Sequence, residues 1–382
     1  MASIIEAPAV FINVQRGGPS TGLPTKTEQG DLNQAFGASQ GDYPRVIVAP
    51  ADIADCYYMT AEALNIAEQF QLPVIILSDL LLGQHVETIA TDVLTPDVPI
   101  ERGEILNEVA AAAMNGRFKR YAFTPSGVSP RVLPGTKGFA YIAATDDHDE
   151  TGVIISDEHT NAALRRKSQE KRMHKLEGVL AKLPAPQLEG PADADITLVG
   201  WGSCWGVIHE AAGLLTQLGT PTNHLHIRYL FPFHSREVRE ILEGCSHTAV
   251  VECNYTGQFA RHLRAETGFS VDDLILKYDG EPFEPGDLVE RVKATLEGQP
   301  TNGQVTQAEA SEMAYHYIRV YLNDKSRPVA FEQISENGYG EPVWQVQIAG
   351  RKEGELVGKL YIGLETGSIH EWRLDSSDAV RA

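Results

Sequence analysis

The chain has 382 residues, 42% hydrophobic and 22% charged, a composition typical of globular proteins and long enough for two or three domains. Its formal net charge of −20 argues against binding to nucleic acid or anionic membranes, because such partners need a basic surface. The longest apolar runs, such as residues 72–83, are interrupted by polar residues, so we predict no membrane span.

In residues 1–182, apolar segments of strand character alternate with segments of helical periodicity. Strands are predicted at 8–14, 45–51 and 73–79, with a helix at 52–70. This alternation predicts an α/β domain with a mostly parallel sheet.

The rest of this region has a different pattern. Residues 84–157 are rich in Pro, Gly and Asp and are predicted to form a long irregular arm. A helix at about 160–182 carries a basic face, which we expect to meet solvent or an acidic subunit surface. The basic residues are Arg165, Arg166, Lys167, Lys171 and Arg172.

A linker rich in Pro and Ala, residues 183–195, leads into a second predicted α/β domain at 192–298. Predicted strands are 196–203, 222–230 and 247–255. Predicted helices are 204–219 and 235–244, the second capped by Ser235 and ended by Gly244.

Residues 300–382 predict a small α+β unit with one amphipathic helix on an antiparallel sheet. The helix is expected at 307–323. The strands are expected at 328–336, 341–350, 354–365 and 368–374, where aromatic and β-branched residues alternate with period 2.

The clearest candidate binding residue follows the first strand. In "VFINVQRGGPST", residues 10–21, a strand runs into Arg16 and then into a bend. An arginine at the carboxyl end of a buried strand is suited to binding an anion, and Gly17 and Gly18 would allow a ligand to approach the backbone closely. The alternative is a structural arginine that binds carbonyl groups at the sheet end.

Other reactive side chains have simpler interpretations. His148, Asp149 and Glu150 form an acidic loop that we expect to be solvated, and Cys204 is expected to be a small hydrophobic residue at a helix start. Asn254 and Tyr255 are expected to fix a strand-end turn at a subunit interface.

The cysteine pattern bears on metal binding and location. No CxxC or Cys/His spacing is present, so we predict no zinc or iron–sulfur ligand set in this chain. The amino terminus lacks the basic region and cleavage site of a signal peptide, and a reducing, cytoplasmic location is expected.

Several motifs in order carry a family resemblance over roughly residues 1–298. Together they resemble the α subunit of 2-oxoacid:ferredoxin oxidoreductases, most closely the 2-oxoglutarate branch. The motifs are "VQRGGPSTGLPTKTEQGDL", "VSPRVLPGTKG", "HDETG", "KRMHKLEGV", "FPFHSREVREIL", "VECNYTGQFARHLRAETG" and "YDGEPFEPGDLVERV". The segment 300–382 more weakly resembles a PepSY-type module.

The resemblance implies a fold. Residues 1–182 would be the carboxyl part of a pyrimidine-type thiamine-binding domain with its arm, and 192–298 would be a transketolase C-terminal-like domain.

The resemblance also implies oxidative decarboxylation of 2-oxoglutarate to succinyl-CoA, with ferredoxin as electron acceptor. Arg16 would bind the substrate carboxylate, and Gly17, Gly18, Ser20 and Thr21 would lie near the cofactor. Thiamine diphosphate with Mg²⁺ and an iron–sulfur cluster would sit on a partner β subunit, and coenzyme A would be the second substrate. Two alternatives stay open: another 2-oxoacid such as pyruvate, or a non-catalytic assembly subunit.

One part of the family pattern is absent from this sequence. A "YPITPST"-type loop and a glutamate that contacts the aminopyrimidine precede the "VQRGG" strand in the family. Three explanations are open: a wrong start, a fragment or a naturally split subunit. We favour a wrong start or a fragment, because cutting a parallel sheet between strands leaves an unpaired, largely apolar edge. The chain alone is then expected to reduce neither ferredoxin nor viologen with a 2-oxoacid.

Overall fold

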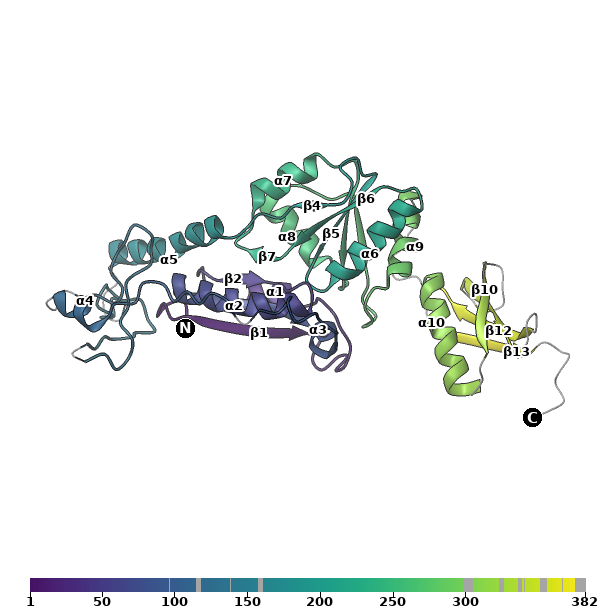
Figure 1. Cartoon of the computed structure of the whole chain (residues 1–382), viewed down its shortest axis with the longest axis horizontal. Coiled ribbons are helices and arrows are strands. Elements are labelled where there is room, and N and C mark those ends of the chain that lie inside the picture. The colour runs from purple at the N-terminus through teal and green to yellow at the C-terminus, as the bar shows by residue number, and fades with distance from the viewer. Residues whose placement is uncertain are drawn as a thin grey trace.

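The computed structural model shows three units arranged along the molecule (Figure 1). It describes the whole chain except residues 96, 115–117, 138, 157–160, 299–304, 323–325, 336–338, 340, 351–355, 366 and 375–382. Among the described residues, no helix has the length and apolar character needed to cross a bilayer. The predicted boundary at 298–300 falls partly outside the described residues.

The first unit is built on a four-stranded sheet with the order β1-β3-β2-β7. β1 (Ala9–Gln15), β2 (Val46–Val48) and β3 (Pro73–Asp79) are parallel. The helix α2 (Ile53–Phe70) returns the chain from β2 to β3, and the short α1 (Leu32–Phe36) lies between β1 and β2. The predicted α/β class with a parallel sheet is confirmed.

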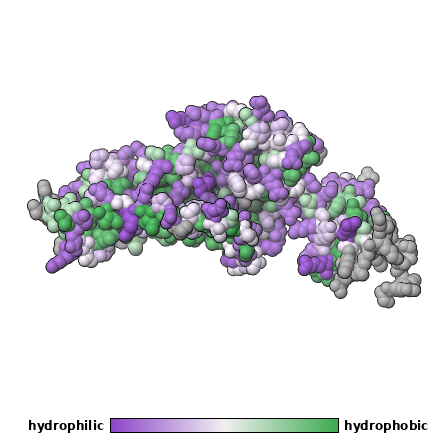
Figure 2. Space-filling model, viewed as in Figure 1, coloured by the Kyte–Doolittle hydropathy of each residue, from purple (hydrophilic) through white to green (hydrophobic). Residues whose placement is uncertain are grey.

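β1 lies at one edge of this sheet and exposes apolar side chains. Phe11, Ile12 and Val14 have exposed fractions of 54%, 60% and 44%. Figure 2 shows hydrophobic residues at the surface of the N-terminal part of the molecule. The predicted apolar edge is therefore present in this structure, and such an edge is a template for pairing with another chain.

The prediction of one continuous strand at 222–230 is wrong. The chain forms β6 (Thr222–Ile227), passes Arg228, and then forms β7 (Tyr229–Phe231). β7 leaves the second unit and pairs antiparallel with β2. Arg228 accounts for the crossing, because its guanidinium pairs with Asp55 while its carbonyl accepts a hydrogen bond from the Ala49 amide.

The second unit is a five-stranded sheet with the order β4-β6-β5-β8-β9. Its remaining strands are β4 (Leu188–Glu189), β5 (Ile196–Trp201), β8 (Thr248–Glu252) and β9 (Asp273–Leu276), and only β4 is antiparallel to its neighbour. Its helices are α6 (Cys204–Gln217), α7 (Ser235–Glu243), α8 (Gln258–Thr267) and α9 (Pro285–Leu296).

The prediction that Ser235 caps the start of α7 is wrong, and the prediction that Gly244 ends this helix is right. His234 occupies the N-cap position, and Ser235 is the first helical residue, with its hydroxyl bonded to the Phe233 carbonyl. Gly244 is the C-cap, as predicted.

The arm between the first sheet and α5 has little regular structure in its described residues, as predicted. It begins with α3 (Leu80–Gln84), contains α4 (Glu108–Ala113) and leads to α5 (Ala162–Lys182). The expectation that the basic face of α5 meets solvent or another subunit is wrong for part of that face. Lys171 and Arg172 are buried and bind Glu6 and Asp147 of this chain.

The third unit has one helix packed on a four-stranded antiparallel sheet, as predicted. α10 (Gln307–Tyr317) continues into a wider turn, η1 (Ile318–Leu322). The strands β10 (Arg327–Ile334), β11 (Val343–Ala349), β12 (Leu356–Gly363) and β13 (Ile369–Leu374) follow in sequence order. Glu309 at the start of α10 binds Lys277 and Arg291, so an ion-pair network joins this unit to the second one.

A buried ion cluster joins the amino terminus to α5. Glu6, with an exposed fraction of 2%, accepts 2.5 Å hydrogen bonds from the Nζ atoms of Lys171 and Lys175. Burial opposes ionisation of the Glu6 carboxyl, but the two nearby ammonium groups outweigh it and lower its pKa to about 2. One carboxylate is therefore the shared counter-ion of two buried ammonium groups near neutral pH.

Glu6→Gln is expected to lower the free energy of unfolding by about 3–5 kcal/mol, because two buried ammonium groups lose their counter-charge. Chemical denaturation at pH 7 measures this loss. Glu177→Gln, on the exposed face of α5, is the control and is expected to change little. The stabilisation by Glu6 is complete above its usual pKa and disappears as the pH falls toward about 2, so the two proteins should converge in acid. Equal stability at pH 7 would contradict the role of this cluster.

Candidate functional site

Arg16 follows β1 at its carboxyl end and is half-buried. Within the described part of the chain, its guanidinium has neither a hydrogen-bond acceptor nor a carboxylate partner. The structural alternative, in which Arg16 binds sheet-end carbonyls, therefore finds no support in these contacts. Gln15, one residue earlier, makes that kind of contact instead: its amide donates to the Ser78 carbonyl at 3.2 Å.

The segment after Arg16, residues 16–31, forms a closed loop that we call the Arg16 loop. The Leu23 amide donates to the Gly17 carbonyl at 2.9 Å, and the Gly17 amide donates to the Lys26 carbonyl at 3.4 Å. A Cβ at Gly17 would lie 3.0 Å from Leu23 and from Glu28, so packing within the loop explains this glycine. A Cβ at Gly18 would have no atom of the chain within 4 Å, which leaves room for a ligand there.

Ser20 and Thr21 lie at the exposed tip of the Arg16 loop. Ser20 has a left-handed backbone conformation, with φ of 57°. Neither hydroxyl has a hydrogen-bond partner among the described residues. The structure therefore brings Arg16, Gly18, Ser20 and Thr21 together in one loop, with polar groups available to a ligand or a partner.

Gln29 fixes the far end of this loop to the second unit. It is buried, its Nε2 donates to the Trp201 carbonyl at 2.9 Å, and its Oε1 accepts from the Cys253 amide at 3.0 Å. Its own amide donates to the Cys253 carbonyl at 2.6 Å, and its carbonyl accepts from the Asn254 side chain at 3.1 Å. Sequence reasoning missed Gln29, since a glutamine in a polar loop gives no signal of burial.

Two buried carboxyl groups organise the strand ends around the loop. Asp79, at the end of β3, caps α3 through the Leu82 amide and accepts a hydrogen bond from Ser203 of the second unit. Glu252, at the end of β8, accepts hydrogen bonds from Asn254 and from two amides at the start of α8. Burial raises the pKa of both carboxyl groups. Asn254 fixes the turn after β8 as predicted, while the part of Tyr255 and the subunit interface expected there stay predictions.

The carboxyl ends of β1, β3, β5 and β8 thus converge on the Arg16 loop. Open α/β sheets bind ligands in the crevice outside the carboxyl ends of their strands. A surface hollow lies beside the loop and is lined by Thr25, Lys26, Thr27, Leu80, Leu81, Gln84, His85, Gly280, Glu281 and Pro282.

The "HDETG" segment lies elsewhere and is structural. The expectation of a solvated loop is wrong for His148, which is 2% exposed and packs with its ring centroid 4.0 Å from that of Tyr121. Asp149 accepts bonds from the Thr151 and Val153 amides, and Glu150 binds Lys119. Asp149 and Glu150 are thus engaged in contacts that shape this segment.

Cys204 is the first residue of α6 and is buried, as predicted. Its Sγ lies 3.9 Å from that of Cys253. Hydrogen bonding to Cys253 and burial raise the pKa of the Cys204 thiol, so it stays protonated at neutral pH and is a poor nucleophile.

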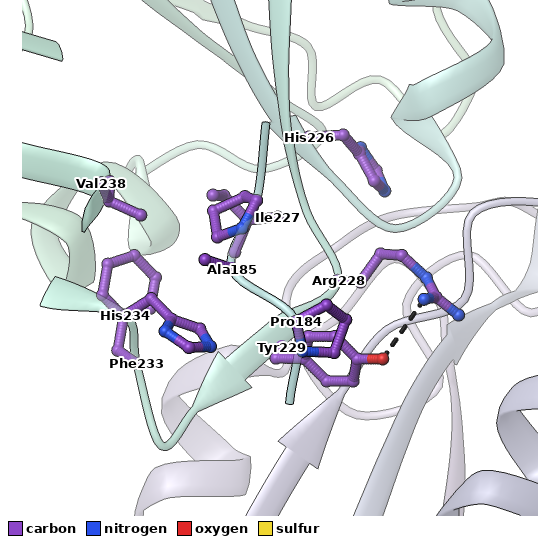
Figure 3. Close-up of a pocket in the computed structure, with 10 residues that line it drawn as sticks. Pro184, Ala185, His226, Ile227, Arg228, Tyr229, Phe233, His234 and Val238 are labelled. Atoms are coloured by element: carbon purple, nitrogen blue, oxygen red, sulfur yellow. Dashed lines mark hydrogen bonds between the residues drawn. The ribbon is translucent and has the colours of Figure 1, made fainter. Parts of the chain in front are cut away.

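A separate small cavity lies between the linker and the end of β6 (Figure 3). Its polar groups are mostly engaged: Arg228 pairs with Asp55, and the Tyr229 hydroxyl donates to Glu62 at 2.8 Å. Arg16 is not among its lining residues. The Arg16 loop is the better candidate for a site that binds an anionic substrate.

Gln29→Ala is expected to loosen the Arg16 loop without unfolding the chain. The change removes the side-chain bonds to Trp201 and Cys253, and each buried group left unpaired costs about 1–3 kcal/mol. Hydrogen exchange of the loop amides, compared with the exposed control Gln40→Ala, measures the effect. Unchanged protection in Gln29→Ala would show that this side chain does not hold the loop.

Two family profiles match the chain. Residues 1–163 match "Pyruvate flavodoxin/ferredoxin oxidoreductase, thiamine diP-bdg", and residues 194–288 match "Pyruvate:ferredoxin oxidoreductase core domain II". Both matches end before residue 300, and the resemblance of the third unit to a PepSY-type module gains no support from them.

Named relatives agree with the profiles. The chain is 34% identical over 296 residues to 2-oxoacid:ferredoxin oxidoreductase 2, subunit alpha, of Aeropyrum pernix, covering 76% of this chain and 44% of that protein. It is 30% identical over 297 residues to 2-oxoglutarate synthase subunit KorA of Archaeoglobus fulgidus, covering 77% of this chain and 74% of that one. The chain thus spans less than half the length of the Aeropyrum relative.

A solved structure is similar as well. The 2-oxoglutarate:ferredoxin oxidoreductase from Magnetococcus marinus, with 2-oxoglutarate, coenzyme A and succinyl-CoA bound, aligns with a TM-score of 0.68 and 34% identity. The alignment covers 76% of this chain and 49% of that one. The chain therefore belongs to the family of 2-oxoacid:ferredoxin oxidoreductase α subunits.

Proposed function

We propose that this chain serves in a thiamine diphosphate-dependent 2-oxoacid:ferredoxin oxidoreductase that converts 2-oxoglutarate to succinyl-CoA, and that Arg16 binds the substrate carboxylate. The observation that carries the proposal is the guanidinium of Arg16. It is held at the carboxyl end of β1, in a region that matches a thiamine-binding family, and no described residue of the chain neutralises it.

The chemistry of a 2-oxoacid explains why an arginine is suited to this place. The carboxylate that leaves as carbon dioxide lies beside the keto carbon, and its orientation relative to that carbon controls the bond that breaks. Two N–H groups of one guanidinium bind both carboxylate oxygens and fix that orientation, which the ammonium of a lysine does less well.

The Arg16 loop also fits one side of a thiamine cofactor. Gly18 leaves open space next to the backbone, and the hydroxyls of Ser20 and Thr21 are available as donors. These residues would contact the cofactor, which supplies the electron sink for decarboxylation when bound. The anchored loop would keep Arg16 at a constant distance from it.

The choice of 2-oxoglutarate rests on the relatives. Those from Mycobacterium tuberculosis, Methanothermobacter marburgensis and Archaeoglobus fulgidus carry 2-oxoglutarate in their names, whereas those from Aeropyrum pernix are named for 2-oxoacids in general. A panel of 2-oxoglutarate, pyruvate and a branched 2-oxoacid separates these possibilities.

The proposed partners are a β subunit that holds the diphosphate, Mg²⁺ and an iron–sulfur cluster, and ferredoxin as electron acceptor. Exposed Phe11, Ile12 and Val14 on β1 support a partner chain at that edge. Four free cysteines support a reducing compartment such as the cytoplasm.

In the assembled enzyme, Arg16→Ala is expected to lower kcat/KM for the 2-oxoacid, because the carboxylate loses its cationic partner. The fall should correspond to a loss of about 2–5 kcal/mol of transition-state stabilisation. Arg16→Lys should recover part of this loss, since it keeps the charge but not the paired geometry. Steady-state reduction of ferredoxin measures both.

Arg236→Ala is the matched control, because that arginine lies on the exposed face of α7 and pairs with the neighbouring Glu237 and Glu240. It should retain full activity. Wild-type turnover by both Arg16→Ala and Arg16→Lys would contradict substrate binding by Arg16 and would favour the alternative of an assembly subunit.

A further inference from the structure

Three potential metal ligands meet on the second unit, far in sequence from the Arg16 loop. Glu189 of β4, His209 of α6 and His224 of β6 place one ligand atom each within 4.8 Å of one another. Glu189 and His224 are direct cross-strand partners in the β4–β6 ladder, and the Nδ1 of His209 lies 3.6 Å from the Oε2 of Glu189.

His224 is the most informative of the three. It is 1% exposed, and in the described structure neither of its ring nitrogens has a hydrogen-bond partner. A buried polar group without a partner costs about 1–3 kcal/mol, so the fold leaves this imidazole with an unmet bonding requirement. An ion pair between Glu189 and His209 alone would not meet it.

We propose that Glu189, His209 and His224 bind a divalent transition-metal ion of the Zn²⁺ type. Two imidazoles and one carboxylate form a ligand set that zinc accepts, with a fourth position for water. Tetrahedral zinc requires ligand atoms about 3.3 Å apart, so a modest rotation of the side chains closes the site. The side chains of Glu189 and His209 are 46% and 61% exposed, and the Glu189 side chain is free to make that rotation.

The surroundings favour the neutral, metal-binding form of His224. Burial, with a smaller contribution from nearby His209, lowers the pKa of His224 to about 4. The imidazole therefore needs no deprotonation to bind a metal at neutral pH. Trp205 stacks on His209 with ring centroids 5.2 Å apart, which holds the second imidazole at the mouth of the site.

The metal would have a structural effect. β4 is only two residues long and lies within the linker, residues 183–195, that leads from α5 to β5. A metal shared by β4, α6 and β6 would fasten this short strand to the sheet and to the helix that packs beside it. Because it would bind the folded state, it should raise the thermal stability of the chain.

This site could not be predicted from the sequence. The predicted absence of a metal site rested on the lack of close Cys and His spacings, whereas these three ligands are spread over 36 positions, from 189 to 224, and meet only through the β4–β6 pairing and the position of α6.

The test is metal binding by the untagged full chain. Wild-type protein should bind one equivalent of Zn²⁺ in competition with a chromophoric chelator, and Co²⁺ should give the visible absorption of a low-coordinate site. Glu189→Gln and His209→Ala should each weaken Zn²⁺ binding by more than about tenfold and remove the metal-dependent rise in melting temperature. Both changes are at exposed side chains, so the variants should fold.

The matched control is His247→Ala. His247 pairs with Asp273 beside the opposite edge of the same sheet, at 2.7 Å. Neither His247 nor Asp273 belongs to the cluster of Glu189, His209 and His224. This variant should bind Zn²⁺ as the wild type does. Absence of stoichiometric binding to wild type, or equal binding by wild type, Glu189→Gln and His209→Ala, would overturn the proposal.

Discussion

The candidate site depends on the contact of Gln29 with the second unit. One buried glutamine satisfies the Trp201 carbonyl at the end of β5 and the Cys253 amide just after β8, while its own backbone pairs with Cys253 and Asn254. These are direct hydrogen bonds between buried groups. Because such bonds are directional, they determine the position of the loop and also stabilise it. The end of β1 and the second sheet are thereby joined through the Arg16 loop.

This arrangement distinguishes Arg16 from Arg172 and Arg228. Arg172 and Arg228 each bind a carboxylate and serve the packing of α5 and the crossing to β7. Arg16 lies on an anchored loop, yet the described chain offers it no acceptor. A cation that is held in place without a partner is prepared to bind an anion, because little conformational entropy remains to be lost on binding.

Much of the fold was predictable because hydrophobic periodicity and turn residues determine it locally. β3 at 73–79 and α2 at 53–70 follow directly from their apolar patterns and from Asp52, whose side chain caps α2. The break of the strand at Arg228 was not predictable, since β6 and β7 are both apolar and differ only in the sheet they join.

The site was predictable only in part. Arg16 stands out because a strand followed by an arginine and two glycines is a local pattern. Gln29, Asp79 and Glu252 do not stand out. Gln29 and Asp79 have partners 124 to 224 residues away, and Glu252 is buried against the start of α8, which only the fold brings to it. Lys171 was misleading for the same reason, since its counter-charge is Glu6, 165 residues earlier in the chain.

The most direct test of the central claim is a structure of the assembled enzyme with a 2-oxoacid bound before decarboxylation, trapped with an inactive cofactor analogue. The proposed role predicts the Arg16 guanidinium within hydrogen-bond distance, about 2.7–3.2 Å, of both oxygens of the carboxylate next to the keto group. A structure in which Arg16 pairs with a carboxylate of a partner subunit, while the substrate lies elsewhere, would contradict it.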